Sequence, residues 1–395
     1  MDRKNNIFNN VAFIFDSNPT NVMVDVKNRS IGYQEYKLKI AINEDTKIRF
    51  AYQYGDGLIR IDNHINSKRK ANILGEFIKI KFDDLQGYID FVQEHGFLFP
   101  IDTNELFAID PNCLVQISKR INATLDLLNM VNGDYDKHTY EDDRYHYKKM
   151  FELAMYILIG NEWCISSGKR NYKSLEYDLQ KLILDGPYDS IGERVSEQEE
   201  INNRRFTIKD AISGDYLLDS TFYRNLINGY DMSNDAYKAI VYLFANKDFD
   251  DKSLNIIVDT IFHYYHDVGV LTEIDYDSAE YEDNPRWSNI SYELENGIID
   301  FAKYVVKNEI DYGIKNIKPV YNEYLMEPNW NVDSLLSAMY FSLFYLDSKK
   351  EMWKRCAYCG GLFLVKRSSA SKIYCNEYCC RNSQQAKHRI KIKNK

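Results

Sequence analysis

The C-terminal part of this chain contains the segment Cys356-Ala357-Tyr358-Cys359-Gly360-Gly361 and, after thirteen intervening residues, the segment Cys375-Asn376-Glu377-Tyr378-Cys379-Cys380. Two cysteines that are separated by two residues and followed by glycine form a tight turn, which points both thiolates at one metal ion. The second group brings the sulfur ligands to four, the number that a closed structural zinc site uses. The sequence therefore predicts one structural zinc ion, with no coordination position left for water.

The residues around the cysteines predict a small treble-clef fold. Residues 362–367 and 372–374 are expected to form a hairpin that residues 368–371 close. Residues 384–393 contain no helix breaker, so a helix is expected to begin near the second group of cysteines, where its positive N-terminal end favours thiolates. A knuckle, a hairpin and a helix that carries two ligands together define the treble clef.

The fourth ligand is either Cys379 or Cys380, which follow Cys375 after three and four intervening residues. Neighbouring residues on a helix point about 100° apart, so only one of the two can face the metal. The favoured set of ligands is Cys356, Cys359, Cys375 and Cys379, with Cys380 as the alternative fourth ligand.

From Arg355 onward the chain resembles the CGNR-type zinc fingers of bacterial regulators. The segments Leu362-Phe363-Leu364 and Tyr374-Cys375 match that family's strand and second knuckle, and a basic helix follows. The signature tetrad differs, because Cys380-Arg381-Asn382-Ser383 has the family's Cys and Asn without its Gly and Arg, whereas aligning Cys379 fits broader Tyr-Cys-x-x-x-Cys fingers. The resemblance covers about forty-five residues. It implies a DNA-binding regulator whose finger follows a domain that senses stress or a ligand.

Charge is divided sharply along the chain. Residues 349–395 contain 13 Lys and Arg against two acids, a balance of +11, although the whole chain carries −9. The remaining residues therefore hold 37 basic against 57 acidic side chains, a balance of −20. An acidic body with a basic tail is the asymmetry expected when one module binds a polyanion.

The basic tail is therefore a candidate nucleic-acid interface. Phosphates would be met by basic side chains, and the amide side chains of the helix could read base edges in a major groove. The candidate contact residues are Lys366, Arg367, Lys372, Arg381, Asn382, Gln384, Gln385, Lys387, His388, Arg389 and Lys391. DNA is favoured over RNA because the resembled family is regulatory. A basic tail can also be a solvated face, pack on the acidic body, or bind a protein partner.

The rest of the chain predicts an α+β protein in three parts. Residues 1–80 contain short segments rich in β-branched and aromatic residues, which predict a small antiparallel sheet. Helical apolar periodicity recurs through residues 81–348, which predicts a large helical domain. Residues 349–395 form the third part, the zinc finger with its basic C-terminal helix.

Several classes of protein are disfavoured. No stretch approaches the roughly 18 apolar residues of a membrane helix, and no secretory signal is recognised, so we expect a cytoplasmic protein without a membrane partner. Motifs of phosphate-binding loops, dinucleotide-binding turns and hydrolase nucleophile elbows are absent from the sequence. No catalytic residue is assigned, and the sequence leans against an enzyme.

One further cluster of polar residues lies in the predicted helical domain. Asp259, His263, His266 and Asp267 are spaced i, i+4, i+7 and i+8 along a helix expected to begin near residue 254, and the first three share one face of it. No HExxH motif accompanies them, and pairs of histidines on helices are common. We interpret these side chains as structural polar contacts.

The leading hypothesis is a zinc-finger, nucleic-acid-binding regulator whose acidic body senses a small ligand or a protein partner. One alternative is an effector of a bacterial or phage conflict system, in which the finger recruits a body that acts on a macromolecule. A second alternative is a finger that docks on a protein and has no role in nucleic-acid binding.

Overall fold

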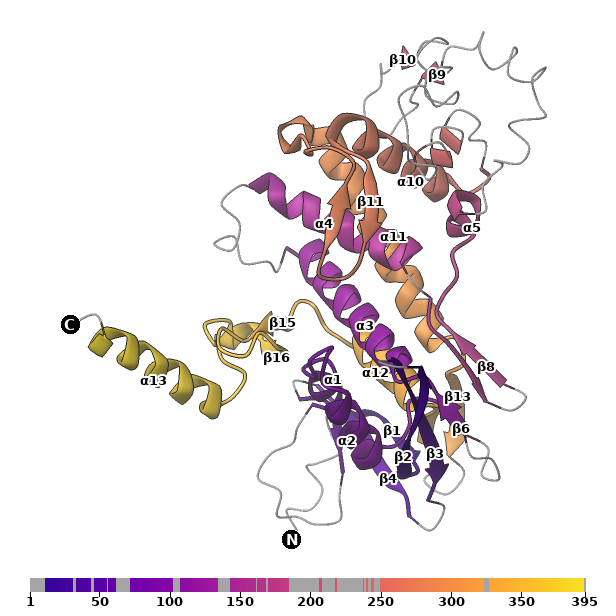
Figure 1. Ribbon diagram of the computed structural model, residues 1–395, viewed down its shortest axis with the longest axis vertical. Coiled ribbons are helices and arrows are strands. Elements are labelled where there is room, and N and C mark those ends of the chain that lie inside the picture. Colours follow the sequence, from indigo (N-terminus) through magenta and orange to yellow (C-terminus); the bar gives the residue numbers. More distant parts are fainter. Residues whose placement is uncertain are drawn as a thin grey trace. The chain divides into compact units, whose positions relative to one another are not determined.

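The computed structural model has the mixed α+β fold that the sequence predicts (Figure 1). It describes residues 11–30, 33–43, 46–54, 56–61, 72–101, 107–133, 143–160, 162–167, 170–184, 206–207, 217–218, 237, 239–240, 243–244, 249–322 and 327–393. Contacts divide the chain into two compact units. Unit 1 comprises Met1–Asn122, Trp163–Ser174 and Glu309–Lys395, and unit 2 comprises Ala123–Glu162 and Leu175–Asn308. This division does not test whether residues 1–80, 81–348 and 349–395 fold separately, so the three-part division stays a prediction.

Unit 1 contains the strands expected near the N-terminus, and they are distributed over two antiparallel sheets. The first sheet has the order β1-β4-β5, with β1 at Val11–Ser17, β4 at Ile48–Gln53 and β5 at Gly57–Arg60. The second has the order β2-β3-β6, with β2 at Thr20–Ser30, β3 at Tyr33–Ile42 and β6 at Phe107–Ile109. The single small sheet expected from residues 1–80 is therefore two sheets, one of which recruits a strand from beyond residue 80.

Short helices and hairpins complete unit 1. Its helices are α1 (Ile73–Phe77), α2 (Leu85–His95), the first part of α3 (Asn112–Val131), the end of α11 (Tyr292–Ile314), α12 (Leu335–Phe344) and α13 (Glu377–Lys393). Its hairpins pair β7 (Cys164–Ser167) with β8 (Arg170–Lys173), β13 (Lys318–Asn322) with β14 (Glu327–Asn331), and β15 (Glu351–Arg355) with β16 (Leu362–Lys366).

Buried aromatic rings form the core of unit 1. The Phe13 ring stacks on that of Tyr52, with centroids 5.8 Å apart, and lies 4.7 Å from that of Phe341 in α12. Every residue of α12 except its last is buried, and Ser334 caps the helix by accepting a hydrogen bond from the Ser337 N–H. Such a helix, apolar on all sides, is stable only inside a core.

A buried ion pair crosses this core. The Arg120 guanidinium donates to both carboxylate oxygens of Glu309, and the Tyr340 hydroxyl lies 3.5 Å from the same carboxylate. Arg120 and Glu309 are only 4% and 3% exposed. Both charges have lost their hydration, and their attraction to each other offsets that desolvation cost.

Unit 2 is mainly helical. Its elements are the second part of α3, α4 (Asp143–Ile159), α5 (Asp178–Leu184), α10 (Lys252–His263), a π-helical turn η2 (Tyr264–Val268), a 3-10 turn η3 (Trp287–Asn289), most of α11, and two short hairpins, β9 (Phe206–Thr207) with β10 (Leu217–Leu218) and β11 (Leu271–Ile274) with β12 (Ala279–Tyr281). The Phe151 and Tyr264 rings stack with centroids 3.5 Å apart in its core. The Tyr281 hydroxyl donates to Glu152 Oε1 at 2.9 Å.

The π-helical turn brings two histidines onto one carboxylate. Asp267 accepts from Nδ1 of His266 at 2.8 Å and from Nδ1 of His263 at 3.4 Å. Burial raises the pKa of Asp267, but the two histidine hydrogen bonds outweigh it and lower the pKa to about 2. The contacts of His263 and His266 with Asp267 are thus local polar contacts, in line with the structural role that the sequence predicts for these side chains.

None of the helices in the described ranges combines the length and the apolar character that a membrane crossing requires.

Candidate metal centre

The four cysteines belong to the segment from β15 to α13, residues 351–393, which we call the cysteine module. It begins with the hairpin β15–β16, and the turn that connects these two strands carries Cys356 and Cys359. Glu351 pairs with Lys366, Trp353 with Leu364 and Arg355 with Leu362. The hairpin predicted between residues 362–367 and 372–374 is therefore wrong. Residues 367–369 form a 3-10 turn, and β16 takes its partner from the segment before the cysteines, because that segment has side chains to bury.

Backbone hydrogen bonds shape the turn that carries Cys356 and Cys359. The Cys356 N–H donates to the Gly361 carbonyl at 3.0 Å, and the Gly360 N–H donates to the Cys356 carbonyl at 2.8 Å. Gly360 has a φ of 70°, in the left-handed region that glycine adopts without steric cost. The glycine after the CxxC pair thus lets the chain turn under the sulfur atoms, as the sequence predicts.

The second pair lies at the start of α13. Cys375 precedes the helix, and Cys379 lies in its first turn, where its N–H donates to Asn376 Oδ1 at 2.9 Å. This is an N-cap hydrogen bond. The sequence analysis did not single out Asn376, although an asparagine just before a helix is a recognisable capping signal. The cap fixes the position of the Cys379 thiol relative to Cys375.

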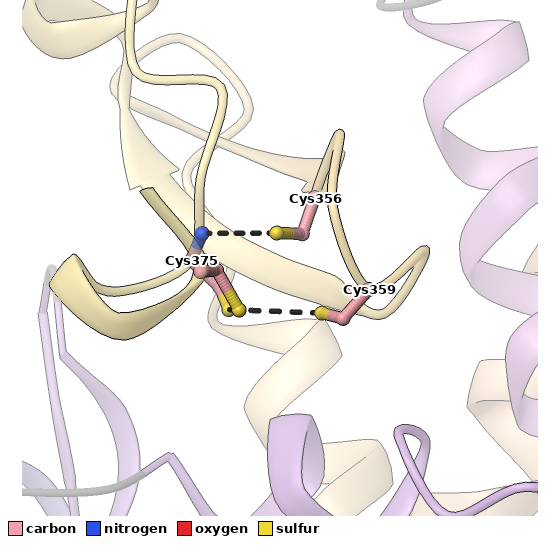
Figure 2. A group of neighbouring side chains, drawn as sticks. Cys356, Cys359 and Cys375 are labelled. Atoms are coloured by element: carbon pink, nitrogen blue, oxygen red, sulfur yellow. Dashed lines mark hydrogen bonds between the residues drawn. The ribbon is translucent and has the colours of Figure 1, made fainter. Parts of the chain in front are cut away.

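Four sulfur atoms converge in this module, and Figure 2 shows three of the residues that carry them, Cys356, Cys359 and Cys375. The Sγ atoms of Cys356, Cys359, Cys375 and Cys379 all lie within 4.8 Å of one another. The Cys359–Cys375 distance is 3.8 Å and the Cys375–Cys379 distance is 3.5 Å. A tetrahedron with zinc–sulfur bonds of about 2.3 Å has edges of about 3.8 Å, so the sulfur positions fit one zinc ion.

Cys380 lies outside this group of four. Its Sγ contacts the side-chain amide of Gln384 at 3.8 Å, one helical turn further along α13. The geometry thus brings together the favoured ligand set and leaves the alternative out. Within the part of the chain that the structure describes, no other group of three or more Cys, His, Asp or Glu side chains comes within metal-binding distance.

The thiols differ in electrostatic environment. Burial raises the pKa of Cys356, but N–H groups of Cys359, Cys375 and Tyr358 outweigh it and lower the pKa to about 6. The Cys375 N–H reaches the Cys356 Sγ at 3.4 Å (Figure 2). Burial raises the pKa of Cys375 and of Cys379, the latter also through its neighbouring sulfur atoms. Neighbouring thiolates repel one another, so the four thiols do not all ionise without a metal. A bound dication would stabilise the thiolates and lower the pKa of each ligand.

The module has a very small core of its own. Cys356, Phe363, Val365 and Cys379 are buried together, with Met352, Tyr374 and Cys375 packed against them. The Tyr374 hydroxyl lies 2.9 Å from that of Ser383, which joins the segment before α13 to the second turn of the helix. Half of the four buried side chains are cluster cysteines, so the metal would hold together a fold that apolar burial alone supports poorly.

The hairpin also belongs to the core of unit 1. Trp353 is 3% exposed, and a Cβ atom on Gly75 of α1 would lie 3.7 Å from its indole ring. Burial, together with the nearby Glu351 carboxylate, raises the pKa of Tyr52 in β4. The cysteine module is therefore anchored through β15 and is not a free appendage.

The structure gives different surroundings to the candidate nucleic-acid residues. Lys366, Lys372, Arg381, Gln384 and Gln385 are exposed, while Asn382 is half-buried. Arg367 is half-buried and donates from Nε to the Ser348 carbonyl, so its guanidinium has a partner within unit 1. The four remaining candidates belong to α13, and the structure describes their backbone but not their side chains: Lys387, His388, Arg389 and Lys391.

Comparisons with protein-family models, with curated proteins and with solved structures find no match for this chain. The features of the chain that bear on function are therefore the geometry of the four-cysteine site and the surface around it.

Proposed function

We propose that the four cysteines hold one structural zinc ion and that the module they stabilise binds the chain to nucleic acid. The observation that carries this proposal is the combination of a four-sulfur site with a positive surface. The site fits zinc, because soft thiolates in a tetrahedral arrangement suit that metal and leave no position for water. When bound, zinc would supply a structural cross-link and no reaction step.

The charge of the module supports a polyanionic partner. Three exposed cations lie along the module: Lys366 at the end of β16, Lys372 between the 3-10 turn and α13, and Arg381 on α13. Residues 349–395 carry a net charge of +11. The nearest acid to Arg381 is Glu377 at 3.4 Å, but this pair is 75% and 80% exposed and therefore weak. The Arg381 charge remains available to phosphates.

DNA is the preferred form of nucleic acid in this proposal, in line with the regulatory fingers that the module resembles. Gln384 and Gln385 are exposed amide side chains on α13, of the type that can pair with adenine edges. The acidic remainder of the chain would then bind a ligand or protein partner, and the protein would act as a regulator in the cytoplasm.

The test is a fluorescence-anisotropy titration of the full-length, zinc-loaded protein against random duplex DNA and single-stranded RNA over a series of salt concentrations. Deleting residues 349–395 would remove the buried Trp353 and disturb unit 1, so charge reversal is the better perturbation. The variant is Lys372→Glu with Arg381→Glu. The matched control is Lys252→Glu with Lys318→Glu, which changes the charge equally at two exposed lysines elsewhere.

We expect the module variant to bind DNA more weakly and to reduce the slope of log K against log salt by about 2, because about 0.9 of a counterion is released per duplex phosphate contact. The control should keep the wild-type slope. Equal effects of the two variants would move the interface away from the module, and no binding at low salt would refute a role on nucleic acid.

A further inference from the structure

The cysteine module exposes large apolar side chains as well as positive charge. Tyr358, Ile373 and Tyr378 are 45%, 47% and 65% exposed. All three belong to the segment that carries the four thiols. Apolar side chains scattered singly over a surface are ordinary, whereas those that gather in one region mark binding surfaces. Among the ring contacts of the described residues, neither tyrosine stacks on another aromatic ring.

The two tyrosines are sequence neighbours of cysteines that belong to the four-sulfur cluster. Tyr358 directly precedes Cys359, and Tyr378 directly precedes Cys379, whose sulfur atoms belong to the same cluster. The Ala357 N–H donates to the Ile373 carbonyl at 2.9 Å, which brings the cysteine turn beside Ile373. The backbone that bears the two rings is thus held in place by the cluster and by the Asn376 cap.

Positive side chains accompany the rings along the same segment. Arg355 and Lys372 are exposed, and Arg381 follows Tyr378 by three residues on α13, which puts both on neighbouring positions of one helix face. Lys372 also lies 5.6 Å from the centroid of the Phe363 ring, and Arg355 donates to the Gly360 carbonyl at 3.2 Å. Along the chain these cations alternate with the two rings in the order Arg355, Tyr358, Lys372, Tyr378, Arg381. Aromatic side chains interspersed with cations suit a strand of unpaired bases and phosphates.

We propose that the nucleic acid bound by this module is single-stranded, with bases stacked on Tyr358 and Tyr378 and phosphates contacted by Arg355, Lys372 and Arg381. This inference rests on the proposed nucleic-acid function and narrows its substrate class. The bases of a duplex cover one another's faces, so an exposed tyrosine ring gains nothing from them, whereas an unpaired base offers a free face.

The experiment compares three probes with the full-length, zinc-loaded protein by anisotropy at one low salt concentration. The probes are an oligothymidylate of about 16 nucleotides, at the long end of single-domain site sizes, its duplex with oligoadenylate, and an abasic strand of equal length that keeps the phosphates. The variants are Tyr358→Ala, Tyr378→Ala, Tyr358→Phe and Tyr378→Phe. Tyr292→Ala is the control, since Tyr292 is 72% exposed and lies in unit 2.

Each alanine variant should bind oligothymidylate about tenfold more weakly and leave binding to the abasic strand unchanged, because stacking on one base is lost. The phenylalanine variants and Tyr292→Ala should bind like the wild type. Tyr378→Leu keeps apolar bulk without a ring and should behave like Tyr378→Ala. The zinc content of every variant is measured alongside, so that a folding defect is recognised.

Two outcomes would overturn the inference and leave the proposed function standing. One is tighter binding to the duplex than to the single strand. The other is an equal loss on the abasic strand and on oligothymidylate in the alanine variants. No binding to any of the three probes would refute the proposed function as well, and the exposed rings would then be a surface for a protein partner.

Discussion

Lys79 lies directly against Gly361, the last residue of the first cysteine turn. A Cβ atom on Gly361 would lie 2.4 Å from Cγ of Lys79 and 3.2 Å from its Cδ. Only glycine fits at this position without a shift of the lysine or the backbone. The contact joins the cysteine module to the segment that follows α1. Burial raises the pKa of Cys375, and the charge of Lys79 offsets part of that rise.

Replacing Gly361 by alanine should therefore destabilise the module. Lys79 is exposed, so its side chain can give way by leaving its rotamer, at a cost of about 0.5–1.5 kcal/mol. We expect a lower unfolding temperature and weaker metal retention, measured by thermal denaturation and metal analysis. Shortening the lysine removes the clash, so Gly361→Ala combined with Lys79→Ala should recover most of the loss.

Gly360 provides a matched control for that prediction. Its φ of 70° disfavours alanine, but nothing lies within 4 Å of the added Cβ atom. Gly360→Ala should cost about 1–2 kcal/mol from backbone strain, and Lys79→Ala should not reverse it. Rescue of both variants, or of neither, would contradict the contact with Lys79.

The two adjacent cysteines of α13 should differ in metal binding. Cys379→Ser removes one of the four clustered sulfur atoms and should abolish stoichiometric zinc, as should Cys356→Ser, with increased proteolysis after Trp353. Cys380→Ser should keep the metal, because its sulfur lies beside Gln384. Metal analysis after dialysis against a weak chelator distinguishes them. Zinc retained by Cys379→Ser and lost by Cys380→Ser would reassign the fourth ligand.

Asp267 should contribute to stability in a pH-dependent way. Its folded pKa of about 2 lies below the unfolded value of about 3.9, so the contribution is complete above about pH 5 and is lost as the pH falls towards 2. Because a third of the side chain is exposed, we expect about 1–2 kcal/mol between wild type and Asp267→Asn in urea unfolding at neutral pH. A difference that persists unchanged at pH 2 would contradict the lowered pKa.

The Arg120–Glu309 pair should behave as a buried unit. Arg120→Met leaves a buried carboxylate without its main cation and should cost about 3–5 kcal/mol, whereas Arg120→Met with Glu309→Met should recover most of that loss. Urea unfolding measures both variants. The exposed pair of Lys303 with Asp300 is the control, and Asp300→Asn should change stability by less than about 1 kcal/mol. Additive effects of the two methionine substitutions would show that the charges are not coupled.

The four-cysteine site could be predicted from sequence because its geometry is local. A CxxC pair with a following glycine determines its own turn, and the second pair lies within five residues of sequence around a helix start. The choice between Cys379 and Cys380 depends on where α13 begins, and the Asn376 cap sets that point. Helix ends are the least regular part of a sequence pattern, which is why the alternative stayed open.

The pairing of β16 with β15 could not be predicted, because the sequence of β15 does not alternate between apolar and polar residues. The inward-facing residues of Glu351–Arg355 are Glu351 and Trp353, and both are buried. A charged residue at an inward position breaks the apolar pattern from which strands are predicted. The Ser-rich segment after β16 offered a turn signal instead, but it forms the 3-10 turn at Arg367–Ser369.

The pairing of the N-terminal strands into two sheets could not be predicted from the sequence for a different reason. Their existence follows from alternation and composition, but pairing between distant segments leaves no local mark. β6 joins β3 through the pairs Leu38 with Ile109 and Ile40 with Phe107. Nothing near residue 107 identifies β3 as its neighbour.

The packing of Trp353 against Gly75 has a consequence for the order of events during synthesis. A ribosome completes α1 long before it reaches β15, and every residue of unit 2 emerges in between. The residues of unit 2 are therefore available to fold while the early strands of unit 1 still await their last hairpin. Contacts of such wide sequence separation form late and leave apolar surface open in the meantime. The surface of α1 at Gly75, which Trp353 covers in the folded chain, therefore stays open until residues 351–366 have emerged.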